Sequence, residues 1–160
     1  MFSSLRTIWP VLTLLGSGAL LAGAHAFERF GGLAPCPLCL DQRKWHWAVV
    51  GVSFVLFIVL RVSPKWARWA GILLGLVLLG ATGMALYHVA VEQGWVIAQC
   101  DARIDFDDLA FDPNAEITIP KCDEIAWSMW SVSMAGWNAL ISGAMATASF
   151  VVALWPEARK

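Results

Sequence analysis

Two pairs of cysteines are the residues of this chain whose types and spacing best suit chemistry. Cys36 and Cys39 flank a Pro-Leu dipeptide, and a pair spaced in this way can form a small disulfide, bind a metal or pass electrons. Arg43 follows the second cysteine by one helical turn and would share its face of a helix. Cys100 and Cys122 bracket a polar stretch. Because no cysteine lies in the middle of an apolar run, the pattern favours redox or metal chemistry over core packing.

The segment from Cys36 to Cys39 is predicted to begin a helix. Pro37 suits the first helical turn, where the N–H that it lacks would have no partner. The partial positive charge of the helix N-terminus and the full charge of Arg43 both favour a thiolate there. Since Cys39 is closer to Arg43, we expect it to be the sulfur with the stabilised thiolate.

Inert disulfides and metal sites are the alternatives for these cysteines. A disulfide between Cys36 and Cys39 closes so small a ring that it would stabilise the fold little. A disulfide between Cys100 and Cys122 could be purely structural, or it could form an electron relay with the other pair. Zinc usually takes four ligands at shorter spacings than that of the second pair. We therefore predict no metal site.

The composition is that of a membrane protein. Hydrophobic residues make up 59% of the 160 positions and charged residues only 14%, whereas a soluble domain has about 25% charged residues. The mean hydropathy is +0.65, and the ten tryptophans suit membrane interfaces. The chain has no basic tract, so we predict no nucleic-acid partner. Its length predicts a single membrane domain, 1–160.

Four apolar runs predict four membrane-spanning helices. About 20 residues cross a bilayer as a helix, and a spanning segment must satisfy its own backbone hydrogen bonds. The predicted spans are about 8–27, 45–62, 69–91 and 132–155, and the loops at the cysteines are about 28–44 and 92–131. The predicted fold class is an all-α integral membrane protein, a four-transmembrane-helix bundle with a longer second loop. Gly71 and Gly75 form a GxxxG pattern, which predicts close helix packing within the chain.

The first apolar run has a second interpretation, as a cleaved signal peptide. Ala24-His25-Ala26 fits the small-residue cleavage pattern, and Arg6 supplies a thin positive region before the run. The run is longer than the roughly 7–15 apolar residues of such peptides, which favours a retained span.

The distribution of basic residues predicts the orientation of the spans. The 61–69 loop holds Arg61, Lys65 and Arg68 and no acid, so the positive-inside rule places it in the cytoplasm. Both termini are then cytoplasmic, and all four cysteines lie on the outer side. An outer, oxidising compartment permits disulfides.

A relay that keeps making disulfides must discard two electrons in each cycle. The chain has no haem motif, no GxGxxG and no flavin fingerprint. A quinone dissolved in the lipid would fit a redox pair at the membrane surface. Arg43 could donate a hydrogen bond to a quinone oxygen. His88, near the end of the third span, could do the same or could be a simple interfacial residue, the role expected of His25 and His46.

Four blocks of the sequence resemble the DsbB family of bacterial disulfide bond formation proteins. They are Cys36-Pro-Leu-Cys39-Leu-Asp-Gln-Arg43, Leu86-Tyr87-His88 with Glu92-Gln93-Gly94, Cys122-Asp-Glu-Ile-Ala-Trp127, and Ser133-Met134-Ala-Gly-Trp137-Asn138. The resemblance runs from about residue 8 to residue 155. Ser131 and Ala135 depart from the family pattern, which has glycine and proline there, and we expect them to change how the fourth helix begins.

The resemblance implies a thiol oxidase of the bacterial inner membrane. The family oxidises DsbA, a soluble thioredoxin-fold protein of the periplasm, and passes the electrons to ubiquinone or menaquinone. All four cysteines are then catalytic. A DsbA thiolate attacks Cys100, the released Cys122 attacks Cys36, and Cys39 faces the quinone.

The resemblance also implies which residues bind the quinone. Arg43 matches the quinone-site arginine of the family, and His88 and Met134 match positions near that site. Other interpretations stay open: a specialised paralogue that serves a different thiol protein, a metal-handling membrane protein that uses both cysteine pairs, and a scaffold with two static disulfides.

Overall fold

The structure is a computed structural model that describes residues 2–97, 100 and 121–156. Most of these residues belong to four helices: α1 (Phe2–Gly31), α2 (Pro37–Val62), α3 (Ala67–Glu92) and α4 (Met134–Leu154). A short 3₁₀ helix, η1 (Pro64–Trp66), connects α2 to α3. All four long helices have the length and apolar character needed to cross a membrane. The predicted fold class, a membrane protein with four spanning helices, is confirmed.

The helix bounds differ most from the predicted spans at the start of α2. Hydropathy placed that start near residue 45, whereas α2 begins at Pro37. The first two turns contain Asp41, Gln42, Arg43 and Lys44, and these polar side chains hide the helix from a search for apolar runs. Within the predicted loop 92–131, residues 98–99 and 101–120 lie outside the described residues.

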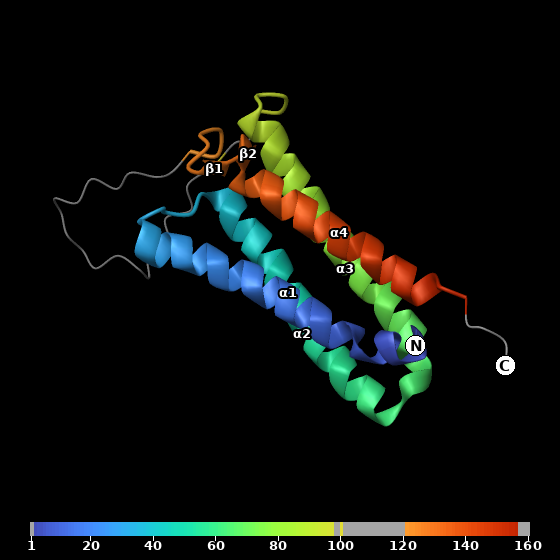
Figure 1. The fold of residues 1–160 in the computed structure, drawn as a ribbon. Coiled ribbons are helices and arrows are strands. Elements are labelled where there is room, and N and C mark those ends of the chain that lie inside the picture. The colour runs from blue at the N-terminus through green and yellow to red at the C-terminus, as the bar shows by residue number, and fades with distance from the viewer. Residues whose placement is uncertain (1, 98–99, 101–120, 157–160) are drawn as a thin grey trace.

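The bundle is elongated, and α3 packs mainly on α4 while α1 packs mainly on α2 (Figure 1). Glycines allow the close approach of α3 and α4. A Cβ atom on Gly71 would lie 2.9 Å from the Cβ of Ala153, and one on Gly75 would lie 2.8 Å from the ring of Phe150. The GxxxG pattern therefore packs within the chain, as predicted.

The two ends of the bundle carry different residues. The start of α1, the end of α4 and η1 lie together at one end (Figure 1), which we call the basic end because it holds Arg61, Lys65 and Arg68. Arg6 joins α1 to α4 there, since its Nε donates to the carbonyl oxygen of Val152 at 2.9 Å. The opposite end, the cysteine end, holds both cysteine pairs. The basic turn and the cysteines therefore lie at opposite ends of the bundle.

A small hairpin at the cysteine end leads into α4. Its antiparallel strands are β1 (Ser128–Met129) and β2 (Val132–Ser133). The two turn residues, Trp130 and Ser131, have φ angles of 51° and 63°. The side chain of Ser133 then caps α4 by accepting a hydrogen bond from an amide of its first turn. The sequence did not predict this hairpin, because strands of two residues show no periodicity.

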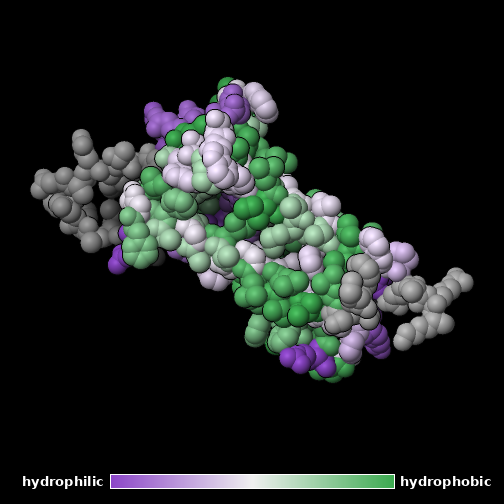
Figure 2. Space-filling view, viewed as in Figure 1, coloured by the Kyte–Doolittle hydropathy of each residue, from purple (hydrophilic) through white to green (hydrophobic). Residues whose placement is uncertain are grey.

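Apolar side chains cover the outside of the bundle. Phe54, Leu76 and Leu140 are each more than half exposed. Figure 2 shows hydrophobic residues along the length of the molecule, with strongly hydrophilic ones gathered toward its ends. Lipid would cover such a surface, whereas a soluble monomer rarely exposes one of this extent.

Candidate active site

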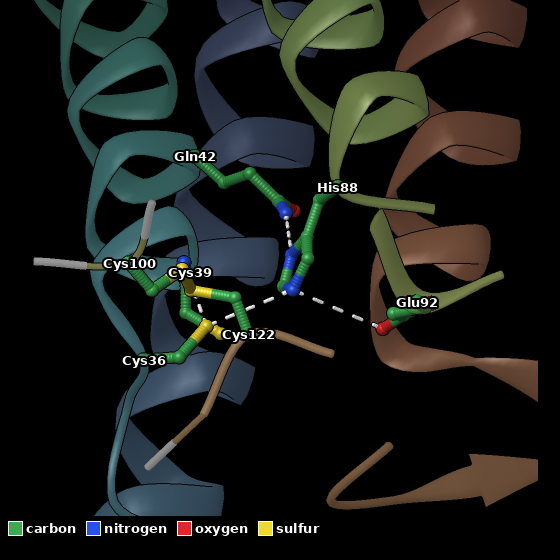
Figure 3. The surroundings of a disulfide bond; sticks show 7 residues. All are labelled: Cys36, Cys39, Gln42, His88, Glu92, Cys100 and Cys122. Atoms are coloured by element: carbon green, nitrogen blue, oxygen red, sulfur yellow. Dashed lines mark hydrogen bonds and ion pairs between the residues drawn. A yellow bond between two sulfur atoms is a disulfide. The ribbon is translucent and has the colours of Figure 1, made fainter. Parts of the chain in front are cut away.

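The two cysteine pairs meet at the cysteine end of the bundle. Cys36 and Cys122 are buried in one hydrophobic cluster, and Cys39 and Cys100 pack against it. Cys100 and Cys122 form a disulfide, whereas Cys36 and Cys39 are free thiols. Figure 3 shows the two pairs next to each other. Residues far apart in the sequence are thus gathered in one place where thiol–disulfide exchange between the pairs is sterically possible.

Cys36 occupies the N-cap position of α2. Its sulfur accepts a hydrogen bond from the Cys39 amide at 3.2 Å, and Pro37 fills the first turn as predicted. A hydrogen bond with the Cys39 side chain, together with burial, raises the pKa of Cys36 above its ordinary value. Cys36 therefore keeps its proton and shares it with Cys39. Of the two sulfurs, Cys39 is the better placed to carry negative charge.

Arg43 is held by the neighbouring helix α1. Its guanidinium forms an ion pair with the carboxylate of Glu28 and donates to the carbonyl oxygen of Ala24 at 3.2 Å. Only 14% of the Arg43 side chain is exposed, so Glu28 balances a largely desolvated charge. The role of Glu28 was not predicted from the sequence. The signal was available, because Glu28 is the only acid that precedes Asp41 in the chain and it ends an apolar run.

His88 reaches from α3 to the cysteines. Its Nε2 lies 3.7 Å from Sγ of Cys36 and 3.9 Å from Oε1 of Glu92, and its Nδ1 lies 2.6 Å from Nε2 of Gln42 (Figure 3). The residue is only 4% exposed. An interfacial histidine would face lipid headgroups and water, so the burial of His88 argues against the simple interfacial role.

Further polar side chains extend from His88 into the bundle. Asn138 donates through Nδ2 to Oε1 of Gln42 at 2.5 Å, and its own Oδ1 lies 2.8 Å from Nε2 of His46. His46 is buried and not interfacial, in contrast to the expectation. The sequence signal for this row of hydrogen-bonded side chains was the spacing of Gln42 and His46, which puts two polar groups on one face of an apolar helix.

A cavity of about 350 Å³ lies beside the cysteines. Cys39, Arg43, His88 and Met134 all line it, and Met134 is the first residue of α4. In Figure 2 a hollow toward the cysteine end has hydrophilic atoms inside a largely hydrophobic rim. Its volume is that of a small-molecule site, for which about 300–1,000 Å³ is typical. Arg43, His88 and Met134, for which the family resemblance implies a place at or near a quinone, therefore share one cavity with both cysteines of the helical pair.

The walls of this cavity fit a flat ring that carries carbonyl oxygens and an alkyl tail. Leu20, Leu21 and Ile141 supply apolar surface from α1 and α4. Arg43 supplies N–H donors, which are the partners that a carbonyl oxygen requires. A polar group of donors within an apolar wall is the usual design of a site for such a ligand.

Comparisons with known proteins give one consistent family. The family model described as disulfide bond formation protein DsbB matches residues 6–152. A disulfide bond formation protein B from Stutzerimonas stutzeri (strain A1501) is 30% identical, and the alignment covers 94% of this chain and 93% of that protein. Proteins of the same name from Azoarcus sp. (strain BH72) and Xylella fastidiosa (strain Temecula1 / ATCC 700964) are each 31% identical, over 86% and 88% of this chain. No solved structure matches the chain.

Proposed function

Because this chain belongs to the DsbB family of disulfide bond formation proteins, we propose that it is a quinone-dependent thiol oxidase. It reoxidises a DsbA-like thioredoxin-fold protein and passes the electrons to ubiquinone or menaquinone. The observation that carries the proposal is the gathering of four cysteines beside one cavity with apolar walls and an arginine. A static scaffold would need neither the cavity nor a pair of free thiols next to the disulfide.

The first exchange takes place at Cys100. A thiolate of the reduced partner attacks its sulfur, the Cys100–Cys122 bond breaks, and Cys122 leaves as a thiolate. Cys100 is partly exposed whereas Cys122 is 2% exposed, so the attack is directed to the sulfur that a protein partner can reach.

The second exchange moves the electrons to the helical pair. Cys122 attacks Cys36 of an oxidised Cys36–Cys39 pair, and Cys39 leaves as the thiolate. The second thiol of the partner then resolves the mixed disulfide at Cys100, and Cys100 displaces Cys36 from Cys122. In sum, the partner dithiol becomes a disulfide and the Cys36–Cys39 disulfide becomes a dithiol, with two electrons and two protons transferred. The pairing in the structure corresponds to the state after this exchange.

The electrons leave when Cys36 and Cys39 form their disulfide again. Arg43 and Met134 line the cavity that would hold a quinone, which would supply a two-electron, two-proton acceptor there. The N–H groups of Arg43 would donate to one of its carbonyl oxygens. Glu28 keeps the Arg43 side chain in place, because its carboxylate is the charged partner of the guanidinium.

The cysteine end is proposed to face the periplasm, with the basic end and both termini in the cytoplasm of a bacterium. Arg61, Lys65 and Arg68 follow the positive-inside rule at the basic end. The chemistry agrees, since disulfides persist in the periplasm whereas cysteine thiols are kept reduced in the cytosol.

The test of this function is a turnover assay with purified protein, a reduced DsbA-like partner and quinone, in which the quinone absorbance is followed over time. We expect quinone loss to match partner oxidation in the wild type and to cease in Cys100→Ser. A normal rate in Cys100→Ser would refute the relay. Comparing several reduced thioredoxin-fold proteins as partners would identify a specialised paralogue, which would oxidise another of them faster than DsbA.

Metal handling is a second candidate function, and one observation favours it. The ligand atoms of Cys36, Cys39 and His88 all lie within 4.8 Å of one another. Two thiolates and an imidazole are ligands that zinc takes. This function predicts stoichiometric metal in the purified protein and no thiol oxidation. A scaffold with static disulfides predicts instead that neither pair reacts in a thiol-trapping experiment.

A further inference from the structure

A continuous chain of hydrogen bonds runs from the middle of the bundle to the sulfur of Cys36. It consists of Ser17 on α1, His46 and Gln42 on α2, Asn138 on α4 and His88 on α3, so every helix contributes to it. Within the described part of the chain, no buried side-chain nitrogen or oxygen lacks a partner. A fully satisfied polar chain in a low-dielectric interior is rigid, and its members polarise one another.

The side-chain amides of Gln42 and Asn138 fix which atom donates and which accepts along this chain of hydrogen bonds. An amide nitrogen only donates and an amide oxygen only accepts. Asn138 donates through Nδ2 to Oε1 of Gln42. The Nε2 of Gln42 is then left to donate to Nδ1 of His88, 2.6 Å away. The Nδ1 atom must therefore carry a lone pair and not a proton.

The inner part of the chain has the same direction. The Oδ1 of Asn138 accepts from the hydroxyl of Ser142 at 3.0 Å and faces Nε2 of His46 at 2.8 Å. His46 therefore carries its proton on Nε2, and its Nδ1 accepts from the hydroxyl of Ser17 at 3.3 Å. From Ser17 onward, each donor points toward the cysteines.

The groups around the other nitrogen of His88 complete the pattern. Its Nε2 faces the sulfur of Cys36 at 3.7 Å and a carboxylate oxygen of Glu92 at 3.9 Å. A cysteine sulfur and a carboxylate oxygen both accept hydrogen bonds. A donor thus lies on the Nδ1 side of the ring and acceptors lie on the Nε2 side.

We infer that Gln42 and Asn138 are positioning residues that fix the tautomer of His88, with the proton on Nε2 and directed at Cys36. In the proposed reaction, on which this role rests, Cys36 is released from Cys122 as a leaving group. A fixed N–H donor at 3.7 Å would stabilise the sulfur at that moment. A histidine with the opposite tautomer would present a lone pair to the same sulfur.

The tautomer also decides between thiol chemistry and metal binding at this site. A histidine that binds a metal through Nε2 must have a lone pair there, and it usually donates its Nδ1–H to a carboxylate or a carbonyl. Here Nδ1 receives an amide N–H from Gln42 instead. Cys36, Cys39 and His88 have the ligand types of a zinc site. However, the group behind His88 donates a hydrogen bond to Nδ1, where a zinc site would have an acceptor. Gln42 thereby keeps the reduced pair a poor metal ligand.

Substituting Gln42→Glu tests this inference by reversing the polarity. A carboxylate would accept both from Asn138 and from Nδ1–H of His88, and Nε2 would then be free to bind a metal. Gln42→Met is the matched control, because it has a similar length and donates to neither residue. Both are made in a Cys100→Ser, Cys122→Ser background, so that the helical pair holds the only thiols.

The first readout is the nitrogen NMR spectrum of the reduced, ¹⁵N-histidine-labelled protein, which contains only three histidines. We expect His88 to carry its proton on Nε2 with Gln42 and on Nδ1 in Gln42→Glu. A proton on Nδ1 in the parent protein overturns the inference. So does an unchanged tautomer in Gln42→Glu. Asn138→Leu provides a variant that does not touch His88, and we expect it to give a mixture of tautomers.

The second readout is titration with Co²⁺, followed by the thiolate-to-cobalt absorption. We expect Gln42→Glu to bind about 10–100-fold more tightly than the parent, the usual effect of a carboxylate behind a metal-binding histidine. Gln42→Met should show no such gain, and equal affinities in all three proteins overturn the inference. Neither readout uses a partner protein or quinone, so the inference and the proposed oxidase activity can fail separately.

Discussion

The two cysteine pairs differ in how the fold holds them. Cys36 and Cys39 sit on the first turn of α2, where a helix cap and His88 fix the first sulfur. Cys100 and Cys122 are tied to the bundle by their own disulfide and by the burial of Cys122 in the shared cluster. Each pair has one buried and one partly exposed sulfur, but the partly exposed sulfur of the helical pair, Cys39, lines the cavity, whereas Cys100 does not. This difference suits the first to a small acceptor in the membrane and the second to a protein.

A small dithiol should separate the two pairs in a turnover assay. Dithiothreitol is small enough to reduce Cys36–Cys39 directly. The Cys100→Ser, Cys122→Ser protein should therefore lose partner oxidation roughly 100-fold or more but retain quinone reduction driven by dithiothreitol. Cys39→Ser should lose both activities. The comparison between the pairs would be wrong if the double variant lost both activities while its fold, checked by circular dichroism, stayed intact.

Removal of Arg43 should affect only the side of the helical pair. Losing a hydrogen bond from a charged donor costs about 1.5–3 kcal/mol, so Arg43→Ala should raise the quinone KM about 10–150-fold. The KM for the partner protein should change little. Steady-state kinetics with each substrate varied in turn would measure both effects.

The matched control for Arg43 is the next residue. Lys44 has a side chain that is 73% exposed, and it pairs with Asp41 at the surface. Such an exposed pair contributes about 0–1 kcal/mol, so Lys44→Ala should leave both KM values near those of the wild type. Equal quinone KM values in Arg43→Ala and the wild type would remove Arg43 from the acceptor site.

The raised pKa of Cys36 should make the reduced wild-type protein lose stability at alkaline pH relative to reduced Cys36→Ser. Cys36 ionises near its ordinary pKa of about 8.5 when unfolded, but the folded protein holds the proton to higher pH. The stabilisation is complete below about pH 8.5 and declines above it, by at most about 1.4 kcal/mol per pH unit. Thermal unfolding of the reduced wild type and reduced Cys36→Ser at pH 7 and pH 9.5 would measure this difference.

Reduced Cys36→Ser is the matched control, because it lacks the Cys36 thiol but keeps that of Cys39. We expect it to lose less stability than the reduced wild type between pH 7 and pH 9.5. An equal alkaline loss in reduced wild type and reduced Cys36→Ser would mean that another group causes it.

The sequence predicted what depends on composition and on short spacing. Apolar runs showed the four helices but placed the start of α2 near residue 45. The position of Pro37 between the cysteines predicted the earlier start that the structure has. The cavity itself could not be predicted, because it depends on how four helices are rotated about their axes. The same holds for the contact between Gln42 and Asn138, which lie on α2 and α4 and meet only after the bundle has packed.

Local backbone geometry was hidden from the sequence in a different way. From the sequence, Ser131 is only a departure from the glycine of the family pattern, with an expected effect on the start of α4. The structure places it second in the tight turn of the hairpin, with φ at 63°. The helix still begins with a normal cap at Ser133, so the departure affects the turn and not the cap.

The hairpin turn gives the smallest effect and acts on the side of the loop pair. Glycine adopts positive φ readily, and tight hairpin turns with two such residues favour it. Ser131→Gly should therefore stabilise the protein by about 0.5–1 kcal/mol, while Ser131→Ala, which keeps a Cβ, should bring no gain. Thermal unfolding of the three proteins in one detergent would compare them. Because the hairpin follows Cys122 and lies outside α2, quinone reduction driven by dithiothreitol should stay at the wild-type rate. An equal gain from alanine would show that the left-handed backbone of Ser131 is not the source of the strain.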